Sequence, residues 1–60
     1  MTPEQRQKVL EKLAYSFAEV CKANGVTNSN DYNWRRANDI YYSELEINGE
    51  NWLLSLIKEK

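Results

Sequence analysis

The sequence predicts an all-α fold: a small three-helix bundle, or a helical hairpin followed by a short third helix. Three observations indicate this class: a helix-start signal at the N-terminus, two segments with apolar residues every three or four positions, and a non-alternating apolar run near the C-terminus. The 60 residues allow one domain, with helices expected at about 3–24, 31–47 and 50–59. A chain this short buries only about 60% of its unfolded surface, so stabilisation by a second copy, as a homodimer, is left open.

The first helix has clear start and stop signals. Thr2 is a cap residue, Pro3 suits the first helical position, and Gln5 stands where a capping box needs it. The stop is Gly25, which suits the left-handed residue after the last turn, followed by Val26 folding back onto that turn as in a Schellman motif.

One arc of this helix is apolar and is expected to face the core. At 100° per residue, the arc contains Leu10, Leu13, Ala14, Phe17, Val20 and Cys21. The opposite arc is charged, and Tyr15 lies in its middle. Tyr15 is therefore expected to point away from the core, either as an isolated surface aromatic or as a contact for a partner.

The second helix is predicted to follow a loop rich in cap and turn formers. Its start has several candidate caps, namely Thr27, Ser29, Asn30 and Asp31. Its apolar stripe comprises Trp34, Ala37, Tyr41 and Leu45, with Ile40 and Ile47 on a neighbouring stripe. Its outer face comprises Arg35, Asp39, Tyr42 and Glu46. Arg35 and Asp39 have the spacing of a helical ion pair.

The segment after residue 47 has two interpretations. Asn48-Gly49 either stops the second helix before a short third one, or forms the turn of a hairpin whose first strand includes the alternating residues 44–47. We favour the helix, because the run 52–57 does not alternate and a lone hairpin would be marginal.

Composition excludes most catalytic and cofactor chemistry. The chain has no histidine, and its two glycines stand far apart, so Ser-His and Cys-His catalysis and glycine-rich nucleotide loops are not expected. We expect a non-enzymatic protein without metal or cofactor. The single Cys21 and the absence of a long apolar run predict a cytoplasmic protein that does not enter a membrane.

One segment resembles the DNA-binding helix-turn-helix. The resemblance rests on Cys21, Gly25, Val26 and Thr27, a small residue four positions before the turn glycine and an apolar residue after it. It implies a second helix starting near Thr27 that presents Asn28, Ser29, Asn33 and Arg36 to a groove of DNA. The formal net charge of −1 gives no basic surplus for the phosphate backbone, so nucleic acid is the less favoured partner.

The favoured hypothesis is a small regulator or inhibitor that docks a helical face onto a larger protein. Aromatic and arginine side chains dominate interface hot spots. The expected contact residues are Tyr15, Trp34, Arg35, Arg36 and Tyr42, with Asp39 and Glu46 as a charged rim. The alternative for Trp34 is that, with Tyr41 and Trp52, it simply builds the core.

Overall fold

The computed structural model describes residues 1–58, which form three helices: α1 (Pro3–Ala23), α2 (Asn30–Ile47) and α3 (Glu50–Ser55). No strand occurs among these residues, so the all-α prediction is confirmed. The hairpin alternative for the segment around Asn48-Gly49 is wrong, because these residues join two helices. None of the helices in the described part of the chain combines the length and apolar content that crossing a bilayer requires.

Both ends of α1 form as the sequence predicts. The hydroxyl of Thr2 accepts from the backbone N–H of Gln5 at 3.2 Å, and the side chain of Gln5 accepts from the N–H of Thr2 at 2.9 Å. At the other end Gly25 has a φ of +79°. The N–H of Val26 donates to the carbonyl of Cys21 at 2.8 Å, which is the long hydrogen bond of a Schellman motif.

Local signals also set the bounds of α2. Ser29, one of the four candidate caps, accepts from the N–H of Tyr32 at 3.2 Å through its hydroxyl. The helix ends at Ile47, and Gly49 turns the chain into α3 with a φ of +84°. A side chain at that φ is disfavoured, so the glycine permits the sharp change of direction between the two helices.

The third helix is shorter than predicted. Its expected end at residue 59 lies outside the described residues, but the helix already stops at Ser55, and Leu56 and Ile57 form a turn. Both residues pack from that turn against the core. Because a helix of so few residues has little stability of its own, packing of these side chains decides the path of the chain.

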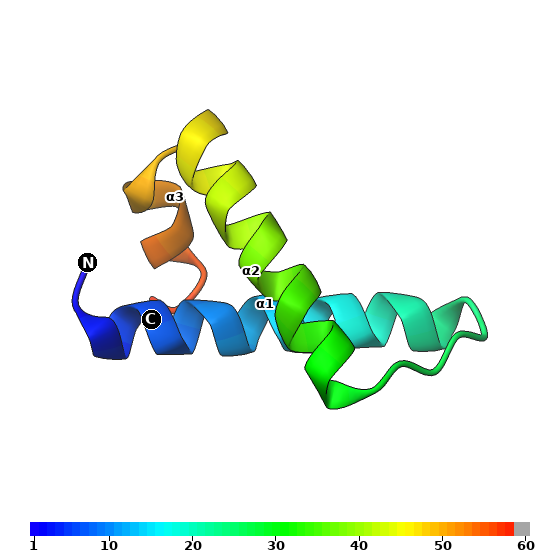
Figure 1. The fold of residues 1–60 in the computed structure, drawn as a ribbon. Helices are drawn as coiled ribbons and strands as arrows, with labels where there is room; N and C mark the ends of the chain where they lie inside the picture. The colour runs from blue at the N-terminus through cyan, green and yellow to red at the C-terminus, as the bar shows by residue number, and fades with distance from the viewer. Residues whose placement is uncertain (59–60) are drawn as a thin grey trace.

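The core lies where α2 crosses α1 and α3 covers the remaining side. Figure 1 shows α2 passing across the middle of α1, with α3 above the N-terminal half of α1. The buried apolar side chains are Val9, Leu10, Leu13, Ala14, Ala37, Tyr41 and Leu53. Partly buried side chains pack around them, namely Trp34, Ile40, Leu56 and Ile57.

The buried face of α1 differs from the predicted arc in two places. Val9, outside the arc, is fully buried, since α3 and the following turn give α1 a second neighbour. Val20, inside the arc, is 61% exposed, and Cys21 is only half-buried. The crossing helix covers the middle of α1 and leaves its last turns uncovered (Figure 1).

The predicted faces of α2 need two corrections. Leu45 of the predicted apolar stripe and Ile47 of the neighbouring stripe are exposed, because the C-terminal turns of α2 extend past α1. The ion pair of this helix joins Arg36 to Asp39 at 3.6 Å, rather than Arg35 to Asp39. The Arg36 side chain lies on the side of α2 that faces the ring of Phe17.

Truncation of Leu53 tests the dependence of the fold on α3. Leu53 is the fully buried residue of α3, so Leu53→Ala is expected to lower the free energy of unfolding by about 2–5 kcal/mol. A domain of this size has roughly 3–5 kcal/mol in total, and the variant should therefore be largely unfolded at 25 °C. Urea denaturation followed by circular dichroism measures this.

The matched control is Leu45→Ala, which removes the same atoms from an exposed position on α2. We expect it to change the free energy of unfolding by less than about 1 kcal/mol. Equal losses in the two variants would show that α3 does not anchor the core.

Candidate functional site

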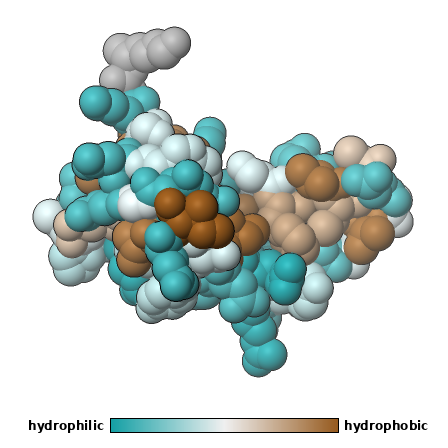
Figure 2. Space-filling model, turned by 90° about the horizontal axis from the view of Figure 1, so that it is seen from above, coloured by the Kyte–Doolittle hydropathy of each residue, from teal (hydrophilic) through white to brown (hydrophobic). Residues whose placement is uncertain are grey.

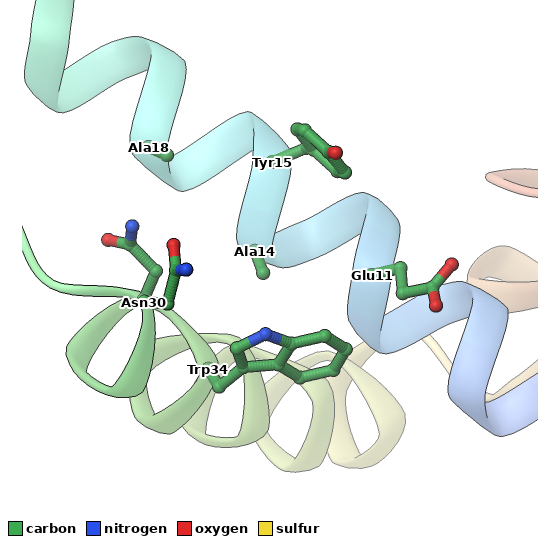
Figure 3. Close-up of a pocket in the computed structure, with 7 residues that line it drawn as sticks. Glu11, Ala14, Tyr15, Ala18, Asn30 and Trp34 are labelled. Carbon is green, nitrogen blue, oxygen red and sulfur yellow. The ribbon is translucent and has the colours of Figure 1, made fainter.

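A groove runs between α1 and the first turns of α2 and contains two of the predicted contact residues, Tyr15 and Trp34. It has a volume of about 360 Å³ and is lined by Glu11, Ala14, Tyr15, Ala18, Asn30, Asn33 and Trp34. Figure 3 shows Asn30 at one end, Glu11 at the other, and the indole of Trp34 between them. Two helices thus bring together residues that lie far apart in the sequence.

Trp34 serves both the core and the groove. Its side chain is half-buried and packs against the buried cluster, while its indole forms a wall of the groove below Ala14 (Figure 3). The amide of Asn38 donates to the carbonyl of Trp34 at 3.0 Å. One part of the Trp34 side chain therefore packs in the core, and another part lines the groove, where it is accessible to a partner.

Tyr15 stands at the rim of this groove. It is 73% exposed, and its ring points away from the indole of Trp34 (Figure 3). The prediction that Tyr15 faces away from the core is confirmed. Its contact with a partner stays a prediction.

Asn33 is the buried polar residue of the groove. The side chain is 8% exposed, and its Oδ1 finds no hydrogen-bond partner among the residues described. A buried acceptor without a donor destabilises a fold by about 1–3 kcal/mol. Burial of Asn33 was not predictable from the residue pattern, because an asparagine in a polar helix segment is usually exposed.

A second cluster lies on the opposite side of the α1–α2 crossing. The rings of Phe17 and Tyr32 have centroids 6.0 Å apart, and the guanidinium carbon of Arg36 lies 5.9 Å from the centroid of Phe17. Val20 and Val26 follow at the uncovered end of α1. We call these five residues the end surface.

The end surface is apolar and open to solvent. Val20 is 61% exposed, Val26 48% and Tyr32 47%. Figure 2 shows separate brown, hydrophobic spots among pale and teal atoms at the end of the molecule that the last turns of α1 form. The sequence marked Val20 as core and made no site prediction for Val26 or Tyr32, because it could not show where α2 crosses α1.

The outer face of α2 is exposed, as predicted, through Arg35, Asp39, Tyr42 and Glu46. Tyr42 is held at the N-terminal end of α1, where its hydroxyl accepts from Arg6 at 3.2 Å and its ring meets Tyr41 edge-on at 5.3 Å. The seven predicted contact residues therefore do not form one surface. They divide among the groove, the outer face of α2 and, for Arg36, the end surface.

The residues predicted for DNA contact do not form one outward-facing helix surface. Helix α2 begins at Asn30 instead of near Thr27, so residues 24–29 connect the helices, where a helix-turn-helix uses a turn of about three or four. Asn28 and Ser29 lie in that connection, and the Ser29 hydroxyl caps α2. Asn33 faces the groove beside α1, so it is not presented outward for base contacts.

The described residues contain no group of three or more His, Cys, Asp or Glu side chains arranged to hold a metal ion. Cys21 is free and half-buried. Comparison with known proteins gives no further assignment: no family model, no curated protein and no solved structure matches the chain. Evidence about function therefore comes from the groove and the end surface.

Replacing Asn33 tests whether its buried amide destabilises the fold. Asn33→Leu removes the unpaired acceptor and fills the same space with apolar atoms, so we expect the free energy of unfolding to rise by about 1 kcal/mol. Thermal and urea denaturation measure the change.

Asn38→Leu is the control, because it gives the same gain in helix propensity but removes the 3.0 Å hydrogen bond to Trp34. It should be neutral or destabilising. A destabilised Asn33→Leu variant would mean that the amide has a stabilising partner in solution.

Proposed function

We propose that this protein is a non-enzymatic regulator or inhibitor that binds a larger protein, and that the end surface makes the central contact. The observation that carries the proposal is the uncovered end of α1, where Val20 and Val26 are exposed and Phe17 is flanked by the exposed side chains of Tyr32 and Arg36. Contiguous apolar patches on small proteins are frequently interaction sites.

The composition of the end surface supports a protein partner. Tyr and Arg are enriched in interface hot spots, and here both lie against the same phenylalanine ring. Arg36 also pairs with Asp39, one of the predicted rim residues. An apolar centre with charged groups at its edge is the usual arrangement of a protein–protein interface.

The arrangement is also partly preorganised. Tyr32 lies in the first turn of α2, which the Ser29 hydroxyl caps, and Val26 is held by its backbone hydrogen bond to Cys21. Side chains fixed on such elements lose less conformational entropy when a partner binds. A chain without histidine, whose surface contacts are held in this way, is better suited to binding than to acid–base catalysis. A free Cys21 fits a reducing compartment such as the cytoplasm.

The test is a charge placed in the centre of the end surface. The tagged protein captures its partner from a lysate of its source, and calorimetry with the purified partner then compares variants. Val20→Lys does not weaken the helix propensity of α1 but introduces a cation among apolar contacts, so we expect affinity to fall by about tenfold or more. Activity of the partner with and without the protein tests regulation.

Ile47→Lys is the matched control. Ile47 is 74% exposed on α2, away from the end surface, and this variant should bind as wild type does. Equal affinity of wild type and Val20→Lys would contradict the assigned surface. In the remaining outcome, the end surface joins two copies of this chain. Sedimentation of wild type and of Val20→Lys detects it, because wild type would then be a dimer and Val20→Lys a monomer.

A further inference from the structure

We infer that the groove between α1 and α2 is an anchor site for an arginine side chain of the partner protein. The inference rests on the proposed protein-binding function and names the chemistry that the partner must bring. Asn33 is 8% exposed in the groove wall, and its Oδ1 has no hydrogen-bond donor among residues 1–58.

The unpaired oxygen requires a hydrogen-bond donor from outside the fold. No described residue donates a hydrogen bond to Oδ1 of Asn33. The backbone N–H of Asn33 already donates to the carbonyl of Ser29 at 3.1 Å. Oδ1 itself is enclosed, so the amide must first turn about its terminal torsion, which is broad in asparagine, to exchange the oxygen with the NH2 group and expose it to the groove. A bound molecule with N–H groups would then satisfy it.

The charge of the groove selects a cation. Within the described part of the chain, Glu11 is the one charged residue that lines it, and Glu11 forms no ion pair there. The lysines nearest in sequence, Lys8 and Lys12, line a separate hollow that also touches Glu11 and Tyr15. A positively charged group entering the groove therefore meets a carboxylate and no competing cation of the groove wall.

The shape and the aromatic wall select a planar cation. The indole of Trp34 lies between Asn30 and Glu11 (Figure 3), and aromatic faces attract a guanidinium by stacking and by cation–π interaction. A guanidinium carries five N–H donors in one plane, enough for the amide oxygen of Asn33 and the carboxylate of Glu11 together. The compact ammonium of lysine offers no plane to stack. A volume of about 360 Å³ is near the lower end of the range for ligand pockets and suits one long side chain.

The groove and the end surface share the first turn of α2. Asn30 lines the groove, and Tyr32 belongs to the end surface. A partner that spans this turn can reach both, so an arginine at the edge of its interface can enter the groove.

The probe is capped arginine, N-acetylarginine N-methylamide, added to the isotope-labelled full chain and followed by NMR. We expect saturable shifts of the Asn33 side-chain amide and of the Trp34 indole N–H, while the indole of Trp52 on α3 stays unchanged. Capped citrulline, which has the same shape without the charge, and capped lysine should each bind about fivefold or more weakly.

Variants locate the binding groups. Asn33→Leu should lose about tenfold or more in affinity for capped arginine. Glu11→Gln should lose about threefold to fivefold for capped arginine and leave capped citrulline unchanged. Glu19→Gln, which changes a glutamate of α1 outside the groove, is the control and should bind as wild type does.

Absence of saturable shifts, equal binding of the three capped amino acids, or full binding by Asn33→Leu would each overturn the inference. These results are independent of the end surface. If Val20→Lys loses the partner while capped arginine does not bind, the arginine site fails and the proposed function stands. If capped arginine binds but the chain binds no larger protein, the proposed function fails and the groove is a cation site only.

Discussion

The structure depends on the packing of α1 against α2, to which each helix contributes a buried alanine. Ala37 is fully buried and Ala14 nearly so, and both belong to the core cluster. Small side chains at a crossing let two helices approach, so larger neighbours such as Leu10 and Tyr41 can interlock around the contact. The position of this crossing decides which parts of each helix are covered. It also produces both candidate surfaces, one on each side of α2.

On one side of the crossing, α2 stops short of the end of α1 and leaves an apolar stripe without a neighbour. On the other side, a polar residue, Asn33, points into the contact and a groove remains. Both features lower the stability that a domain of this size can reach, since one exposes apolar area and the other buries an unpaired acceptor. Local departures from ideal packing of this kind are expected where a protein binds something else.

Sequence reasoning was most successful where the determining groups are neighbours in the chain. The capping box of Thr2 and Gln5, the Schellman turn at Gly25 and the Ser29 cap all depend on residues within about five positions of one another. It failed for Val9 and Val20 because periodicity gives the direction of a face but not the length over which a second helix covers it. The end of α3 was missed for a related reason: the packing of Leu56 and Ile57, and not a local stop signal, ends the helix.

The sequence by itself determined the all-α class, the start of α1, the ends of α1 and α2, and the exposure of Tyr15 and of the outer face of α2, because helix signals and the 3.6-residue period act locally. Only the tertiary structure decided that Trp34 and Asn33 share a groove with Glu11, and that Val20 joins Tyr32 and Arg36 at an open end. Those placements follow from where the two helices cross, which is set by packing between residues distant in the chain.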